Sequence, residues 1–372
     1  MRVYVDRRLI THFEWMLPLF AVAVCGLGIA TVYSATHAPG GEGPSPLALR
    51  QGMWFAGGCA GMLLVLAFDY RRLDRYAYLV YVAVVVALVL VPLVGRVAGG
   101  SRRWIALGPV SIQPSEFMKP ALVVALAHYF ARTATVRLTL REMVVPALLT
   151  IPPVILILVQ PDLGSAAMLG FVLLSMLVLG GVRLRWFALL ALPVVVASPL
   201  LGPVAWKHLK TYQQQRILTF IDPELDPQGA GYHIIQSKIA VGSGMVWGRG
   251  FLRGTQNHLN FLPEQHTDFI FSVFSEEFGF IGAAALMVLY LGLLLRGLVI
   301  ASRARDRFGV LLALGVMSIV FWQVVVNVGM TTGLLPVVGI PLPFFSYGGS
   351  SLFGMLVGIG LVMNVSMRRH LF

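Results

Sequence analysis

Charged residues are scarce in this sequence: only 12% of its 372 residues are Asp, Glu, Lys or Arg, whereas 58% are hydrophobic. A soluble domain carries about a quarter charged residues, so the water-soluble classes are excluded. Apolar runs of about 20 residues, the length that crosses a bilayer, recur along nearly the whole sequence with short charged breaks between them. Together with a mean hydropathy of +0.82, this pattern indicates a polytopic membrane protein and excludes a disordered chain, a coiled coil and a cytosolic dinucleotide-binding enzyme.

Cysteine is nearly absent, and several catalytic motifs are missing altogether. Cys25 and Cys59 both lie inside apolar runs without a CxxC or Cys/His cluster, so we interpret them as packing residues. No Walker A, HExxH or GxSxG pattern occurs, which removes ATP-driven transport and the usual hydrolases. The Gly-rich stretch GSGMVWGRG at 242–250 is not preceded by a predicted strand, so nucleotide binding is excluded.

We expect one all-α transmembrane domain over residues 1–372, built from ten helices. The fourth helix begins with the polar segment QPSEFMKP and carries His128, so it is expected to line a cavity on one face. The connection at about 203–267 holds aromatic, charged and Gly-rich pieces, which predicts a large ordered loop carrying short helices between helices 7 and 8. The expected spans are residues 13–34, 48–68, 76–95, 115–131, 143–159, 163–181, 185–204, 268–295, 309–332 and 345–366.

Positive charge exceeds negative charge, with 28 Lys and Arg against 16 Asp and Glu, a formal net charge of +12. In a membrane protein this excess is read loop by loop, and here Arg concentrates in alternate short breaks. Because arginine-rich short loops stay in the cytoplasm, both termini are predicted to be cytoplasmic and the 203–267 loop extracytoplasmic. No nucleic-acid partner is expected. The Arg-rich breaks are residues 2–8, 71–75, 132–141, 183–185, 296–307 and 368–369.

The polar residues that are unusual for a bilayer fall on the outer side of this topology. An ionisable group in the hydrocarbon costs roughly 2.5 to 3.5 kcal/mol on insertion scales, so several on one side predict a hydrated functional cavity. The residues concerned are Arg102, Arg103 and Trp104, Glu116 with Lys119, Asp162, Arg216, Glu264 to Asp268 and Ser346 to Ser351.

Asp268 stands where this outer loop becomes a helix, and two interpretations remain open. The carboxylate either satisfies the free amides at the helix start or belongs to a cavity wall, because Ser272 and Ser275 share its helical face. The segment at 336–351 is likewise either a Pro- and Gly-rich break or an unwound element whose Ser hydroxyls and backbone amides face a ligand.

Two charged groups at the outer boundary also have two interpretations. Glu116 and Lys119 form either a helix-stabilising ion pair or a charge pair that marks a cavity. Arg102, Arg103 and Trp104 are either an interfacial anchor or a grip on a phosphate that also covers an apolar tail.

Four segments of the sequence resemble the SEDS family of bacterial cell-wall proteins (shape, elongation, division, sporulation), and the length, the expected ten spans and Gly329 with Met330 resemble its RodA-like branch. The last two of these segments are highly specific, and the likeness runs from about Trp15 to the C-terminus. The segments are QPDLGSAA (160–167), DPQGAGYHIIQSKIAVGSG (226–244), LPEQHTDFIFSVFSEEFG (262–279) and NVGMTTGLLPVVGIPLPFFSYGGSS (327–351).

The resemblance implies a peptidoglycan glycosyltransferase that polymerises lipid II at the outer face of the bacterial cytoplasmic membrane for cell elongation and shape. It further implies a complex with a class B penicillin-binding protein and other elongation-complex proteins. By the same resemblance, Asp268 is the essential carboxylate, and Trp104, Glu116 and Lys119 are further functional positions.

The chemistry of glycan polymerisation fits these residues. The 4-hydroxyl of one lipid-linked sugar attacks the anomeric carbon of another, and undecaprenyl diphosphate leaves without needing a proton, so one carboxylate base and cationic stabilisation suffice. We expect Asp268 to be the base. The residues expected to contact substrate are Trp104, Arg102, Arg103, Glu116, Lys119, Arg216, Glu264, His266, Ser346 and Ser350.

No cofactor is evident in the sequence, and assistance of the diphosphate by a divalent cation is left open. Two alternative functions differ in what they require. A lipid II flippase would place polar residues along the full depth of a central path, whereas here they concentrate on the outer side. A non-catalytic scaffold of the cell-wall synthesis complex would leave Asp268 without a function.

Overall fold

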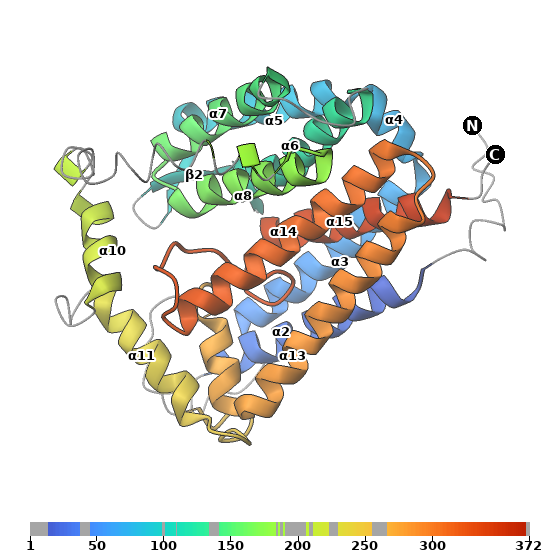
Figure 1. The fold of residues 1–372 in the computed structure, drawn as a ribbon. Coiled ribbons are helices and arrows are strands. Elements are labelled where there is room, and N and C mark those ends of the chain that lie inside the picture. Colours follow the sequence, from blue (N-terminus) through green and yellow to red (C-terminus); the bar gives the residue numbers. More distant parts are fainter. Residues whose placement is uncertain are drawn as a thin grey trace.

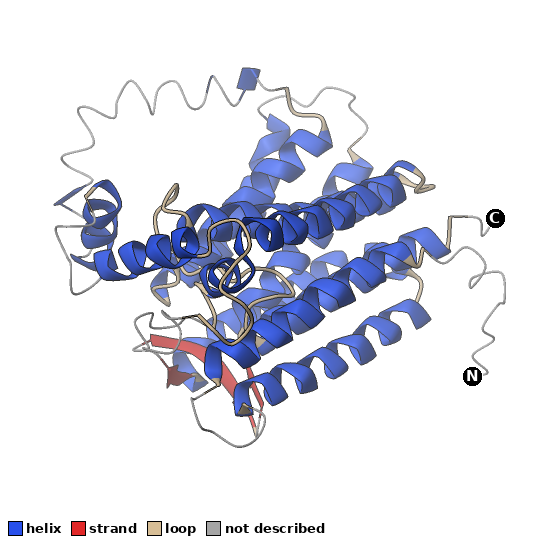
Figure 2. Ribbon diagram, turned by 90° about the horizontal axis from the view of Figure 1, so that it is seen from below, coloured by secondary structure: helices blue, strands red, loops and turns tan. Residues whose placement is uncertain are grey.

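The computed structural model describes residues 14–37, 45–98, 101–108, 110–133, 141–183, 185–186, 189, 206–207, 211–222, 230–254 and 266–369. Helices dominate this part of the chain, with a few strands at one end (Figure 2). The elements are α2 Met16–Thr36, α3 Pro46–Ala67, α4 Tyr70–Arg75, α5 Ala77–Val94, β1 Arg96–Ala98, β2 Ser101–Leu107, β3 Val110–Ile112, α6 Pro114–Arg132, η1 Arg141–Met143, α7 Val144–Val159, α8 Leu163–Gly180, α10 Thr211–Ile221, α11 Ala230–Ser243, α13 Ile270–Ser302, α14 Arg307–Thr331 and α15 Gly349–Met367.

The helical membrane fold predicted from the sequence is confirmed. Eight helices in the described part of the chain are long and apolar enough to cross a membrane, and α6 adds a ninth long helix whose first turn is polar, as expected for the fourth span. α13 continues to Ser302, beyond the predicted end at 295. The predicted seventh span, 185–204, lies almost wholly outside the described residues.

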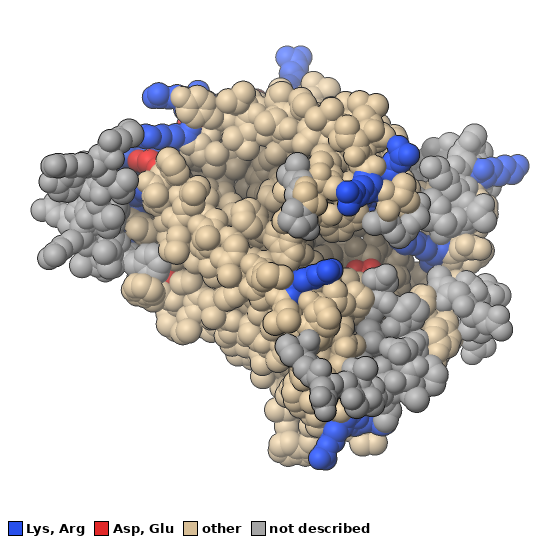
Figure 3. Space-filling model, turned by 180° about the vertical axis from the view of Figure 1, so that it is seen from behind, with Lys and Arg blue, Asp and Glu red and all other residues tan. Residues whose placement is uncertain are grey.

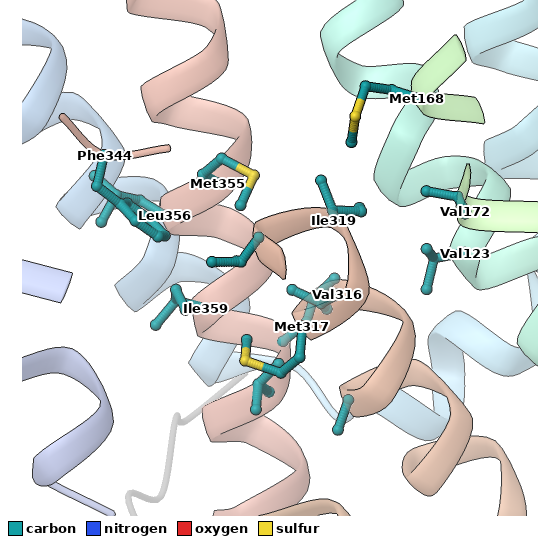
Figure 4. Close-up of a cluster of buried hydrophobic side chains, with 14 of the residues drawn as sticks. Val123, Met168, Val172, Val316, Met317, Ile319, Phe344, Met355, Leu356 and Ile359 are labelled. Atoms are coloured by element: carbon teal, nitrogen blue, oxygen red, sulfur yellow. The ribbon is translucent and has the colours of Figure 1, made fainter. Parts of the chain in front are cut away.

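α14 and α15 form the centre of the bundle (Figure 1). In their most apolar windows 67% and 83% of the residues are buried, against 11% in α3, so α3 is a peripheral helix and these two are central. Figure 4 shows side chains of α6, α8, α14 and α15 meeting in this core, among them Val123, Met168, Val316 and Met355. Gly315 permits the contact between α14 and α6, since a Cβ there would lie 2.4 Å from Val123 Cγ1.

The peripheral helices expose apolar side chains outward, as a lipid-facing surface requires. On α3, for example, Met53 and Leu63 are 66% and 62% exposed. Figure 3 shows that residues other than Lys, Arg, Asp and Glu cover most of one face of the molecule. The exposed apolar surface and the eight candidate spans agree with a multi-pass membrane protein.

A small antiparallel sheet, with strand order β1-β2-β3, follows α5 and was not predicted from the sequence. Arg96 pairs with Trp104, and Ile105 pairs with Ile112. The sheet lies between the expected spans 76–95 and 115–131. Two of its strands have only three residues each, and Arg and Gly break their alternation, so no strand pattern stands out in the sequence. The sheet matters because its middle strand carries Arg103 and Trp104.

The end of the bundle opposite the sheet holds the start of α2, the end of α15 and α4 (Figure 1). Here the Tyr70 hydroxyl donates to Asp306, the residue that caps α14. Burial, together with this carboxylate, raises the pKa of Tyr70. His128 Nδ1 lies 2.8 Å from Asp74 Oδ1, so α6 is fixed to α4 as well. Arg-rich breaks, such as 71–75, gather at this end, but the orientation of the termini stays a prediction.

Candidate active site

A polar cavity of about 300 Å³ lies where β2, α6, α8, α10 and the turn before α13 meet the segment before α15. Figure 1 places β2 and α10 at the end of the bundle away from the termini. Three cationic and three anionic side chains from the described residues face this cavity. They are Arg103, Lys119, Arg216, Glu116, Asp162 and Asp268.

Asp268 lies in a turn directly before α13 and lines the cavity. The cap residue of α13 is Phe269, which makes no side-chain capping bond, and Asp268 stands one residue before it. Asn327 Nδ2 donates to the Asp268 main-chain oxygen at 3.0 Å and to the Ile340 oxygen at 2.7 Å. One buried amide thus fixes the turn to the segment before α15.

Gly339 lets that segment approach the Asp268 carboxylate. Its φ is +72°, a backbone conformation that residues other than glycine rarely adopt. A Cβ at this position would lie 3.2 Å from Asp268 Oδ2. The Pro- and Gly-rich segment at 336–351 is therefore an ordered wall of the cavity rather than only a break between helices.

Glu116 and Lys119 form an ion pair in the first turns of α6. Lys119 Nζ lies 2.8 Å from both Glu116 side-chain oxygens. Lys119 is 2% exposed and Glu116 is 7% exposed. Both line the cavity, so the interpretation of the pair as a cavity charge pair agrees with its position. Removing one partner of such a buried pair leaves an uncompensated charge and is strongly destabilising.

Asp162 is a buried carboxylate with a structural task. It caps α8: its Oδ1 accepts from Ser165 N at 3.1 Å, and its Oδ2 accepts from Ser165 Oγ at 2.8 Å and Gln113 Nε2 at 3.2 Å. Asp162 is one of the predicted outer polar residues but is not among the predicted substrate contacts. Its side-chain oxygens are committed to the fold.

Arg103 and Trp104 reach the cavity from β2. Arg103 Nε donates to the Gln160 oxygen at 3.0 Å, and Nη2 donates to the Pro161 oxygen, so β2 is tied to the turn before α8. Arg102, the neighbouring residue, is exposed, donates to the Pro92 oxygen at 3.3 Å and does not line the cavity. The contact of Arg102 with substrate therefore stays a prediction.

Three further residues that were predicted to contact substrate do not line the cavity. The His266 main-chain oxygen accepts from Tyr347 N at 2.9 Å, Ser346 Oγ accepts from Leu342 N at 2.8 Å, and Ser350 Oγ accepts from Gln113 N at 3.1 Å. These contacts shape the wall, while the cavity itself is lined by Tyr347 and Ser351. Glu264 lies outside the described residues.

The polar stripe on α13 faces a different neighbour from the one predicted. Ser272 Oγ lies 2.6 Å from Ser237 Oγ of α11, and both are buried. Ser272 and Ser275 do not line the cavity, so the prediction that they continue its wall is wrong. The Ser272 hydroxyl instead joins α13 to α11.

Within the described ranges, no group of three His, Cys, Asp or Glu is close enough to hold a metal ion. Positive charge in the cavity comes from Arg103, Lys119 and Arg216, on three different elements. These three cationic side chains suit a substrate that carries negative charge.

Comparison with known proteins places the chain among cell-wall proteins. The model of the FtsW, RodA and SpoVE family, described as a cell cycle protein, matches residues 14–371. The chain is 42% identical to the peptidoglycan glycosyltransferase MrdB of Escherichia coli K12 over 311 residues, 83% of each chain. It is 34% identical to the peptidoglycan glycosyltransferase RodA of Treponema pallidum, over 97% of this chain and 99% of that one.

Solved structures show the same fold. A chain of a peptidoglycan synthase complex, solved to explain the coordination of polymerization and crosslinking, has a TM-score of 0.81 and 34% identity over 97% of this chain and 99% of its own length. The rod shape determining protein RodA of Thermus thermophilus has a TM-score of 0.70 and 31% identity over 97% and 98%.

Proposed function

Because this chain belongs to the FtsW, RodA and SpoVE family and is a peptidoglycan glycosyltransferase, we propose that Asp268 is the general base that joins two lipid II molecules in the polar cavity. The observation that carries this proposal is the position of the Asp268 carboxylate in a cavity lined by three cations. The same chemistry favours a glycosyltransferase over the alternatives of a flippase or a scaffold.

The other two carboxylates in the cavity have protein partners that hold them in the wall. Glu116 is held by Lys119 through both of its oxygens. Asp162 accepts hydrogen bonds from Ser165 and Gln113 through both of its oxygens. Each of these two carboxylates therefore has a role in the structure of the cavity wall.

The reaction balances with one base. The 4-hydroxyl oxygen of the acceptor sugar forms a bond to the anomeric carbon of the donor, and its proton passes to Asp268. The bond between the anomeric carbon and the diphosphate oxygen breaks, and the diphosphate leaves with the electron pair. Arg103, Lys119 and Arg216 stabilise the charge that develops on it. Attack from the face opposite the leaving group inverts the anomeric centre.

The proposed setting is the outer face of the bacterial cytoplasmic membrane, with both termini in the cytoplasm. Lys and Arg in alternate short breaks support this orientation. A penicillin-binding protein partner is supported by the likeness to a chain of a synthase complex that coordinates polymerization with crosslinking. We propose that the partner is a class B transpeptidase in the same membrane, acting with other elongation proteins.

The direct test of the base is an amide at position 268. The Asp268→Asn chain is purified in detergent, given labelled lipid II, and assayed for glycan polymer on a gel. Loss of the base is expected to lower the polymerisation rate by about 100-fold or more. Asp222→Asn is the matched control, because Asp222 is exposed after α10 and does not line the cavity. A folded Asp268→Asn chain that polymerises at the wild-type rate would exclude this role.

A further inference from the structure

A second cavity, of about 710 Å³, adjoins the first. Trp104, Thr267, Tyr347 and Gly348 line both cavities and so form the edge between them. Thr267 directly precedes Asp268, which lines only the first cavity. A molecule in the second cavity therefore meets the base across this shared edge.

The lining of the second cavity is mostly apolar and aromatic. Besides Trp104 and Tyr347 it includes Trp54 of α3, whose indole packs against the backbone of Gly349: a Cβ at Gly349 would lie 2.1 Å from Trp54 Cε2. Gln51, one turn earlier on α3, donates to the Ser346 oxygen at 2.9 Å and holds the helix against the start of α15. Flat aromatic faces with polar edges suit a saccharide, which has apolar CH faces and a polar rim.

The charges of the two cavities differ. The first contains three cations and three carboxylates, whereas Arg50 is the one charged residue among the described residues that line the second. Negative charge develops on the diphosphate that leaves during the reaction, and stabilising it takes several positive groups. A diphosphate that stays attached to its sugar needs only to be positioned, for which one arginine is enough.

The second cavity also has a path to lipid. Leu49 and Met53 flank Arg50 on α3 and are 54% and 66% exposed. Met53 itself lines the cavity. A polyprenyl chain attached to a diphosphate at Arg50 can therefore lie along the exposed apolar face of α3.

We propose that the second cavity is the acceptor site: it binds the lipid-linked saccharide whose hydroxyl gives up its proton, while the first cavity binds the diphosphate of the donor. This inference rests on the proposed function. The acceptor hydroxyl reaches over Thr267 to Asp268, which takes the proton as the oxygen bonds to the donor anomeric carbon. The diphosphate then leaves into the group of three cations in the first cavity.

The test separates the two substrates with two analogues of lipid II. In the donor-only analogue, a further sugar caps the 4-hydroxyl. In the acceptor-only analogue, a methylene replaces the anomeric oxygen, so the diphosphate cannot leave. Together they give one transfer and one pentasaccharide product, and the KM of each analogue is measured while the other is held at a saturating concentration.

Arg50→Ala and Trp54→Ala are each expected to raise the KM of the acceptor-only analogue by about ten-fold, the effect of one lost polar or stacking contact, and to leave the KM of the donor-only analogue unchanged. The matched controls are Arg96→Ala and Trp247→Ala, at exposed residues outside both cavities. Arg50 is exposed, so its substitution leaves the fold intact even where that of Trp54 does not.

Other results overturn the assignment. If only the KM of the donor-only analogue rises, the second cavity binds the donor and not the acceptor. If both KM values are unchanged in Arg50→Ala and Trp54→Ala, the second cavity binds no substrate. These outcomes differ from a failure of the proposed function, which would appear as full single-transfer activity in Asp268→Asn.

Discussion

At the scale of the residue, the buried pair of Glu116 and Lys119 gives the first prediction. Lys119→Met leaves the Glu116 carboxylate buried without a counter-charge and is expected to cost about 3 to 5 kcal/mol of stability. Adding Glu116→Gln is expected to restore much of that stability, but not polymer synthesis, because the cation is lost from the cavity. Thermal unfolding in detergent and polymer yield are measured on the same samples. Single variants that are silent in both assays would contradict a cavity role for the pair.

A second prediction concerns Gly339. In Gly339→Ala, the Cβ strains the positive φ and presses on Asp268 Oδ2, so kcat is expected to fall by about ten-fold or more, since a small misplacement of a reacting group is costly. Gly170→Ala is the matched control, because a Cβ there has no atom within 4 Å. Equal kcat values for the two variants and wild type would mean that the approach of Gly339 to the carboxylate is not needed.

Individual side chains were predicted from the sequence to different extents. Asp268, Trp104, Arg103, Glu116, Lys119 and Arg216 all line the cavity, because ionisable groups in an apolar chain have few places to lie. Ser346 and Ser350 face the backbone instead, since a hydroxyl in a tight turn bonds locally as readily as it faces a ligand. Only coordinates can separate these two outcomes.

At the scale of the element, α13 shows a break that sequence reasoning missed. Gly279 has φ 66° and ψ −165°, which interrupts the helix. The segment before Phe251 completes the lost bonds: Arg249 N donates to the Glu276 oxygen at 2.9 Å, and Phe280 N donates to the Met245 oxygen at 2.8 Å. Because the partners that make this kink stable come from another part of the chain, the local pattern of α13 predicts only a continuous helix.

The contact between α4 and α14 gives a third prediction. Tyr70→Phe removes a hydrogen bond to a carboxylate and is expected to cost about 1.5 to 3 kcal/mol, with polymer synthesis unchanged because the cavity is at the other end of the bundle. Burial raises the pKa of Tyr70, so the hydroxyl keeps its proton below its ordinary pKa of about 10, and the bond is lost only as the pH rises beyond that. The stability difference between Tyr70→Phe and wild type should therefore be constant from about pH 6 to pH 9.

Thermal unfolding of detergent-solubilised wild type and Tyr70→Phe at several pH values checks this prediction. Phe308→Leu replaces the ring that stacks on Tyr70 by another apolar side chain. It is the control for the loss of packing alone. A stability difference that disappears at neutral pH would show that the hydroxyl does not donate to Asp306.

At the scale of the whole molecule, the prediction concerns sidedness. On a background without Cys25 and Cys59, a cysteine at the exposed Gln215 of α10 is expected to react with an impermeant thiol reagent added to intact spheroplasts. A cysteine at the exposed Arg305 is expected to react only after permeabilisation, because the Arg-rich breaks stay inside. The reverse labelling would put the cavity on the cytoplasmic side, where a transport function would fit better than polymerisation.

The class of fold was predictable because hydropathy and loop charge act over whole segments. The sheet of β1, β2 and β3 was not predictable, because its strands are too short to show an alternation of apolar and polar residues. The pairing of the two cavities is also a property of the whole molecule. Trp54 and Gly349 are far apart in the sequence and meet only when α3 packs on α15.

The central claim is that Asp268 acts as a base and does not merely hold the substrate or the fold. The measurement that tests it most directly compares lipid II binding with lipid II turnover in the same preparation of Asp268→Asn. The amide keeps the size of the side chain but is a poor proton acceptor, so binding at the wild-type affinity with no polymer is the predicted result. Polymer at the wild-type rate, or loss of binding and turnover together, would contradict the claim.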